Sequence, residues 1–176
     1  MTLTLTQIAR KILESQFEEK KFKLDNKTKE KYPEKLSCFV TLTKNRELRG
    51  CIGSLTPTQE LWKDVQENAI NAAFNDPRFL QLKKDELKQI KIEVSVLSQP
   101  RKLIYKNPDD LLDKIKKDMG IILKKNFHSA TFLPQVWEQI PDKVEFLQHL
   151  SMKAGLPADA WKNSEIFYYN VKIEKE

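Results

Sequence analysis

Apolar residues recur with helical spacing near the start of the chain and mark strands in later segments. Ile8, Ile12, Leu13 and Phe17 would share one face of a helix over residues 6–19. Residues 20–36 are charged and poor in apolar side chains, so they are expected to form a surface connection. Strands are predicted, mostly from alternating apolar and polar positions, over residues 37–43, 48–55, 90–97, 119–124 and 166–173.

Cap and turn residues place the remaining helices. Thr56 can cap a helix that has Pro57 in its first turn and Gln59 completing a capping box, and Pro77 ends it after position 75. The same reasoning predicts helices over residues 107–117 and 142–154. A short helix is expected near residues 85–89, and a short turn or helix over residues 134–137.

Helices and strands are mixed without a regular strand–helix–strand rhythm, and residues 44–47 suit a hairpin turn. This order favours an α+β fold with a largely antiparallel sheet over a doubly wound parallel sheet. Because about 100 to 200 residues commonly build one core, the 176 residues predict a single domain.

The composition excludes several protein classes. Hydrophobic residues make up 40% and charged residues 32%, which provides a core and argues against disorder. No apolar run approaches the roughly 18 residues of a membrane span, and no signal peptide is visible, so no membrane association is expected. With only Cys38 and Cys51, a disulfide-built secreted fold is disfavoured and a cytoplasmic location is predicted.

The net charge of +6 comes from two segments. Residues 1–49 hold 12 basic and 7 acidic side chains, and residues 101–125 hold 8 and 4. Such segments could bind nucleic acid through phosphate contacts. We favour a solvated lysine-rich surface, because acidic residues are interspersed and no series of aromatic residues accompanies the lysines.

Residues 48–53 (LRGCIG) carry the most unusual chemistry. Gly50 and Gly53 interrupt a predicted strand, which is typical of a bulge or of close approach by a backbone or ligand. Cys51 is a candidate nucleophile or redox thiol, and Arg49 could lower its pKa. The alternative is a small buried cysteine without chemistry, since no histidine lies nearby in the sequence.

The expected hairpin register sets the neighbours of this thiol. A turn centred on residues 45–46 pairs Val40 with Cys51 and puts Arg49 on the same face as Cys51. Cys38 is then a diagonal neighbour of Cys51, at a spacing of roughly 7–8 Å that is poor for a disulfide.

Asp76 and Arg78 form a second constellation at the end of a predicted helix. They could clamp the helix break, or they could line a cleft in which Arg78 binds a carboxylate or phosphate. His128 and His149 lack the spacing of a zinc site with the two cysteines, so no metal site is predicted.

Several segments together resemble the AMMECR-domain family, whose bacterial and archaeal members are called AmmeMemoRadiSam system protein A. The resemblance covers nearly the whole chain and rests on residues 39–42, 48–53, 72–73, 76–79, 93–97, 133–136, 146–147 and 153–156. One departure is Ser151, which stands where family members often have a cysteine.

The resemblance implies one AMMECR domain over residues 1–176, with two interleaved subdomains. A larger lobe would hold the antiparallel sheet and its helices, a smaller lobe would pack against it, and residues 48–53 would lie near the cleft between them. Binding residues are then expected to be Gly50, Gly53, Asp76, Arg78, Pro134 and Gln135. The resemblance implies radical SAM and Memo-like proteins as partners, but no reaction and no cofactor.

Two main hypotheses follow. We favour a binding component for a ligand or partner, because no base accompanies the Cys51 thiol. The alternative is an enzyme that uses Cys51 on a small molecule or macromolecule, with Arg49 as activator and Arg78 as anion clamp. Nucleic-acid binding through the basic segments is the weakest candidate.

Overall fold

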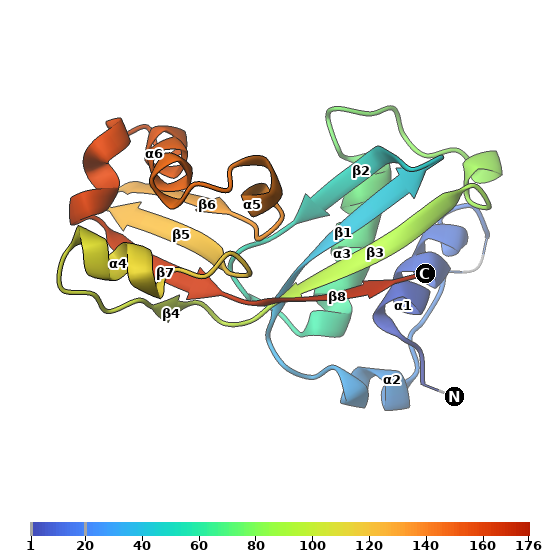
Figure 1. The fold of residues 1–176 in the computed structure, drawn as a ribbon. Helices are drawn as coiled ribbons and strands as arrows, with labels where there is room; N and C mark the ends of the chain where they lie inside the picture. Colours follow the sequence, from blue (N-terminus) through green and yellow to red (C-terminus); the bar gives the residue numbers. More distant parts are fainter. Residues whose placement is uncertain (1, 20) are drawn as a thin grey trace. The chain divides into compact units, whose positions relative to one another are not determined.

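The computed structural model describes residues 2–19 and 21–176, which fall into two compact units (Figure 1). Unit 1 runs to Leu97 and also contains Lys172–Glu176, and unit 2 is Ser98–Val171. Each unit combines a four-stranded sheet with helices, and the strand pairs run antiparallel. The predicted α+β class with antiparallel sheets is therefore confirmed.

Unit 1 has the strand order β2-β1-β3-β8. Its strands are β1 (Ser37–Lys44), β2 (Glu47–Gly53), β3 (Ile90–Leu97) and β8 (Val171–Lys175). Its helices are α1 (Leu5–Ser15), α2 (Asn26–Lys31) and α3 (Leu61–Phe74), followed by the short 3-10 helix η1 (Lys84–Glu86). Buried residues of α1, α3 and the sheet form one hydrophobic core that includes Ile8, Leu13, Val40, Leu42, Val65, Ala69 and Ile92.

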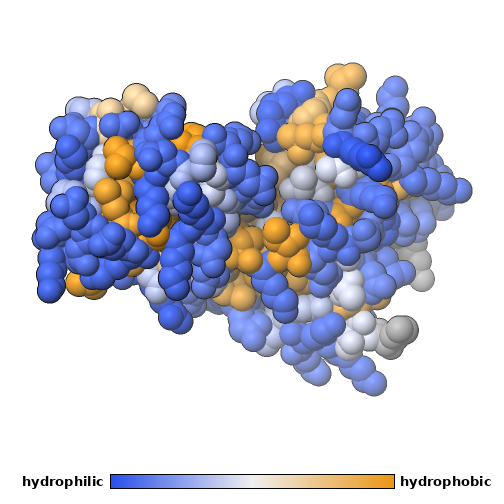
Figure 2. Space-filling model, viewed as in Figure 1, coloured by the Kyte–Doolittle hydropathy of each residue, from blue (hydrophilic) through white to orange (hydrophobic). Residues whose placement is uncertain are grey.

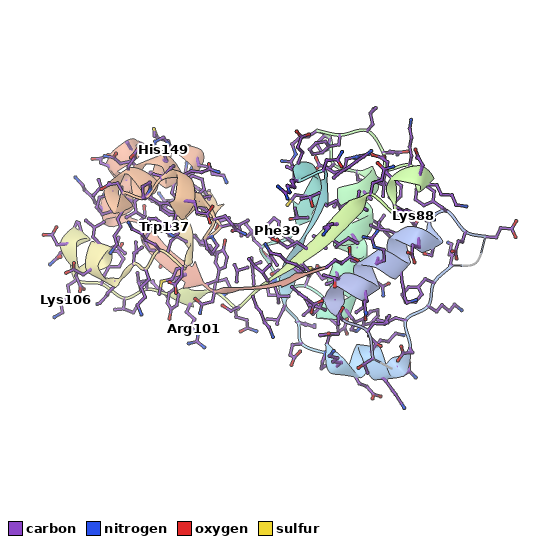
Figure 3. All side chains as sticks on the ribbon, turned by 45° about the vertical axis from the view of Figure 1, so that its right-hand side comes forward. Phe39, Lys88, Arg101, Lys106, Trp137 and His149 are labelled. Carbon is purple, nitrogen blue, oxygen red and sulfur yellow. The ribbon has the colours of Figure 1, made fainter. Side chains whose placement is uncertain are left out.

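Unit 2 has the strand order β4-β7-β5-β6. Its strands are β4 (Arg101–Lys102), β5 (Gly120–Lys125), β6 (His128–Phe132) and β7 (Glu165–Tyr169), and its helices are α4 (Pro108–Lys114), α5 (Val136–Gln139), α6 (Lys143–Lys153) and the 3-10 helix η2 (Ala158–Asn163). Trp137 lies inside this unit, stacked on Phe146 with ring centroids 3.5 Å apart (Figure 3). Within the described residues, none of the helices is long and apolar enough to cross a membrane.

The predicted start of one helix was wrong, and one helix was not predicted. Helix α3 begins at Leu61, after Glu60, and not at the Thr56 cap. The side chain of Gln59 donates to Asp64 and Glu67 inside the helix, so it does not form the predicted capping box. The expected surface connection contains helix α2, whose first turn is capped by Asp25.

The strand predicted over residues 166–173 is divided between the two sheets. It changes from β7 to β8 at Asn170, whose backbone bonds Ser98 in both directions: the Asn170 carbonyl accepts from the Ser98 N–H at 2.9 Å, and the Asn170 N–H donates to Ser98 Oγ at 3.0 Å. Apolar alternation continues through Asn170, so the sequence pattern could not show this division.

The hairpin register shifts by one residue at a β-bulge. The turn has positive φ angles at Asn45 and Arg46, which suits a two-residue hairpin. The predicted register holds next to the turn and changes beyond it, leaving Arg49 as the extra residue. Cys51 consequently pairs with Thr41, and the predicted pairing of Val40 with Cys51 was wrong.

The same shift corrects the relation between the two cysteines. Cys38 and Thr41 are three positions apart in β1, so they lie on opposite faces of the sheet. Cys51, which is opposite Thr41, is therefore not a diagonal neighbour of Cys38, and both cysteines are free.

The two glycines of β2 leave room for atoms of this chain. A Cβ at Gly50 would lie 2.1 Å from the carbonyl oxygen of Ala72 in α3. A Cβ at Gly53 would lie 2.4 Å from the ring of Phe39, which Figure 3 labels on β1. Gly50 therefore lets α3 pack against the edge of the sheet, which is the close backbone approach that the sequence predicted.

We expect Gly50→Ala to lower the free energy of unfolding by about 3 kcal/mol, because the added methyl group meets backbone that cannot rotate away. Urea denaturation followed by circular dichroism measures this. Leu48→Ala is the matched control in the same strand, since its exposed side chain should change stability by no more than about 0.5 kcal/mol. A Gly50→Ala protein as stable as the control would contradict the packing described here.

Candidate functional site

Asp76 is the most buried charged side chain of the predicted constellation, with 1% of its side chain exposed. It follows the C-cap of α3, and its Oδ1 accepts from Arg78 Nε at 3.0 Å and from the Arg78 backbone N–H at 3.1 Å. Its Oδ2 accepts from Arg78 Nη2 at 2.7 Å and from the Cys51 N–H at 2.9 Å. These donors, chiefly the Arg78 guanidinium, hold the pKa of Asp76 well below its usual range.

The Asp76–Arg78 pair also closes the edge of the sheet. β2 is an outer strand, and Arg78 Nη2 donates to the Cys51 carbonyl at 3.1 Å. Cys51 thus has its N–H bonded to Asp76 and its C=O bonded to Arg78, as if a further strand lay beside it. Exposed strand edges invite pairing with other chains, so this arrangement protects β2 at Cys51. The clamp predicted at the helix break is present and reaches into residues 48–53.

Arg49 forms a second ion pair, with Glu86 of η1. Its Nε and Nη2 donate to the two Glu86 carboxylate oxygens, both at 3.0 Å, and Lys44 Nζ donates to the same carboxylate at 3.1 Å. This pairing, chiefly with Arg49, lowers the pKa of Glu86 to about 2. The observed partner of Arg49 is therefore a carboxylate, and its role as activator of Cys51 stays a prediction.

The two cysteines occupy different environments. Cys51 is half-buried, and its Sγ lies 3.2 Å from Thr41 Oγ1. Cys38 is fully buried: its Sγ donates to Asp64 Oδ2 at 3.3 Å, and burial raises the pKa of the thiol well above its usual range. Cys51 is thus the less buried of the two cysteines, both of which lie in unit 1.

Both histidines lie in unit 2. His128 Nδ1 is 2.9 Å from the Ala154 carbonyl oxygen at the end of α6, and His149 is exposed on α6 beside Glu145 (Figure 3). Neither belongs to the unit that contains Cys51. Across residues 2–19 and 21–176, His, Cys, Asp and Glu form no group of three or more that could hold a metal ion.

A surface groove of about 470 Å³ lies beside the clamp in unit 1. We call it the basic groove. The residues that line it are Lys44, Arg49, Arg78, Phe79, Leu80, Gln81, Lys83, Asp85 and Glu86. Arg78 has 54% of its side chain exposed, although its guanidinium is fixed by Asp76. In Figure 2, hydrophobic residues gather at the upper edge of unit 1, where Figure 1 places the segment between α3 and η1.

The structure brings only some of the predicted site residues together. Arg49 and Arg78 line the basic groove, and Asp76 is bonded to the backbone of Cys51. Sequence reasoning missed Lys44, Lys83 and Glu86. A signal existed in residues 80–83, where Gln81 and Lys83 alternate with Leu80 and Leu82 in a segment for which no element was predicted.

Pro134 and Gln135 lie in unit 2 at the start of α5. The Pro134 carbonyl accepts from the Trp137 N–H at 3.1 Å, and Gln135 is the residue before the helix. Both residues have local structural roles, and their binding role stays a prediction. The same holds for the predicted binding role of Gly50 and Gly53.

We expect a thiol reagent such as iodoacetamide to modify Cys51 in the folded protein while leaving Cys38 unmodified, because Cys51 is only half-buried and Cys38 is fully buried. Peptide mass spectrometry over time gives both rates. A Cys51 rate above that of a free model thiol at neutral pH would support a reactive thiolate, and an equal or lower rate would remove that hypothesis. Rapid modification of Cys38 would contradict its burial.

We expect stability to fall as the pH drops from about 4 towards 2, because two carboxylates have folded pKa values below their unfolded values of about 3.9 and 4.3. Unfolding then takes up protons, so the stabilisation that these two carboxylates contribute is fully present above this window and is lost within it. Asp76→Asn and Glu86→Gln should each flatten the curve, measured by urea denaturation between pH 4.5 and 2.5. Glu47→Gln, at an exposed position in the hairpin, is the control, and an unchanged slope in both variants would contradict the ion pairs.

Comparison with known proteins agrees with this architecture. The AMMECR1 family model matches residues 6–174. Protein NEQ441 of Nanoarchaeum equitans is 42% identical over 179 residues, covering 99% of both chains, and a protein of Aquifex aeolicus is 37% identical, covering 98% of this chain and 92% of its own. The crystal structure of uncharacterized protein PH0010 from Pyrococcus horikoshii has a TM-score of 0.83 at 34% identity and covers 98% of this chain and 89% of that one. The family predicted from residues 48–53 and the other segments that resemble it is therefore confirmed: the chain belongs to the AMMECR1 family.

Proposed function

We propose that the protein is a binding component that recognises an anionic group of a ligand or partner in the basic groove. The observation that carries this proposal is the position of Arg78, whose side chain is half exposed in the groove while the buried Asp76 fixes its guanidinium. A guanidinium fork suits carboxylates and phosphates, and one that is already ordered loses less entropy on binding.

Other cations of the groove support the same function. Lys44, Arg49 and Lys83 line it with Arg78, against the carboxylates of Asp85 and Glu86. Arg49 Nη1 is buried and makes no hydrogen bond within the described part of the chain. A buried donor without a partner costs about 1–3 kcal/mol, so an acceptor that reached it would be favoured.

The partners and location belong to the same proposal. The family resemblance supports work with radical SAM and Memo-like proteins in the cytoplasm. Genes for such proteins beside the gene of this chain would strengthen the proposal, and their absence from the genome would remove this part of it.

An enzyme that uses Cys51 is the second candidate, because Cys51 is a free, half-buried cysteine whose thiol lies within hydrogen-bond distance of the Thr41 hydroxyl. The binding function is better supported, since Arg49 is paired with Glu86 and unit 1 contains neither histidine. Cys51→Ser should therefore leave binding in the basic groove nearly intact, whereas an enzyme would lose its turnover.

Titration of the full chain with inorganic phosphate, followed by amide chemical shifts, tests the binding function. We expect saturable shifts at Arg78 and Lys83 that weaken at higher salt. Lys83→Glu should weaken binding about tenfold, because it replaces an attractive charge by a repulsive one at a solvent-exposed position.

Lys88→Glu is the matched control, because Lys88 is exposed in unit 1 (Figure 3) but does not line the basic groove. It makes the same charge change, so binding should stay within about twofold of the original protein. Chemical-shift changes that do not saturate, or an equal loss of phosphate affinity in both variants, would show that phosphate binding depends only on the net charge of the protein.

A further inference from the structure

We infer that the occupant of the basic groove is an acidic peptide segment of a partner protein that also carries aliphatic side chains. This inference rests on the proposed anion-binding function and names the class of partner. It starts from Leu80, which is 84% exposed, lines the groove and is the next residue but one after Arg78.

The lining combines apolar and cationic side chains in a short segment. Residues 78–83 contribute Arg78, Phe79, Leu80 and Lys83 to the groove, whereas Leu82 points into the core and its N–H bonds the Ala73 carbonyl at 2.8 Å. The buried Leu82 anchors this extended segment against α3, so its cations and Leu80 are presented together. Leu48, directly before Arg49, is also 44% exposed. The adjacent side chains of Phe79 and Leu80 form an apolar part of the lining that is surrounded by charged residues, and an apolar patch with a polar rim is typical of a protein-binding surface.

The charges favour a peptide over a nucleic acid. Asp85 and Glu86 line the groove with the cations, and the Glu86 carboxylate already pairs with Lys44 and Arg49. A phosphodiester backbone carries a charge at every nucleotide and would bring several of them against these carboxylates, and among the residues that line the groove only Phe79 is an aromatic side chain on which a base could stack. A peptide can place one carboxylate on Arg78 and Lys83 and an aliphatic side chain on Leu80.

Recognition would use side chains more than strand addition. The outward N–H and C=O of Cys51 are bonded to Asp76 and Arg78, so a peptide cannot pair with β2 at that residue.

The size of the groove also favours a peptide. Its volume of about 470 Å³ is larger than the volume that a single inorganic anion would fill.

Fluorescence anisotropy of a labelled octapeptide of alternating glutamate and leucine, added to the full chain, tests the inference. Two matched peptides replace every glutamate by glutamine or every leucine by serine. We expect the first replacement to weaken binding at least about tenfold and the second about fivefold. Leu80→Ser in the protein should weaken binding of the original peptide about fivefold, and this loss should exceed the loss in binding of inorganic phosphate. Lys88→Glu again serves as the control for charge.

The outcomes separate the inference from the proposed function. Saturable phosphate binding with no gain from the leucines would overturn the acidic-aliphatic partner and leave the anion site standing. Failure of both phosphate and peptide would overturn the two together. Tighter binding of single-stranded DNA of equal charge, or of vesicles containing anionic lipid, would also overturn the inference. Binding that requires both glutamates and leucines would support it.

Discussion

The structure around residues 48–53 depends on the buried carboxylate of Asp76. It accepts the Cys51 N–H and three donors of Arg78, which in turn donates to the Cys51 carbonyl. The Asp76 side chain thereby fixes the chain just after α3, accepts a backbone N–H of the outer strand β2, and orients the half-exposed guanidinium of Arg78. A buried carboxylate is costly without such partners, so its pairing with Arg78 couples the stability of unit 1 to the position of the groove.

The bulge in β2 explains why Arg49 serves the groove. The extra residue shifts the pairing, so Thr41 comes opposite Cys51 and Arg49 is directed to Glu86. Glu86 also holds Lys44 from the other strand of the hairpin, and η1 is thus tied to both strands. Gly50 completes the arrangement by letting the backbone of Ala72 approach. Gly50, the bulge and the two ion pairs together hold Lys44 and Arg49 in the lining of the basic groove.

Local patterns predicted most of the elements because they depend on neighbouring residues. The strand at Ile90–Leu97 and the Asn107 cap follow directly from alternation and cap chemistry. The glycines of residues 48–53 indicated a bulge or a close backbone approach. The place of the bulge at Arg49 was not predicted, because it depends on how β2 pairs with β1 and packs against α3, which lies further along the chain. Asp76 and Arg78 were recognised as a pair, but their bonds to Cys51 span 25 and 27 positions. The groove was missed because Lys44, Lys83 and Glu86 look like ordinary surface charges until the fold brings them together.

The coupling of the Asp76 clamp to the basic groove is tested most directly by the amide chemical shift of Cys51 during titration of the full chain with inorganic phosphate. Arg78 lines the groove and also donates to the Cys51 carbonyl. An anion bound to its guanidinium should therefore shift the Cys51 amide signal, with the same titration midpoint as the Lys83 amide signal. The amide of Cys38, which is bonded to Asp64 on the opposite face, should not move. Phosphate binding that leaves Cys51 unchanged, or that moves Cys38 equally, would contradict the coupling of the Asp76 clamp to the basic groove.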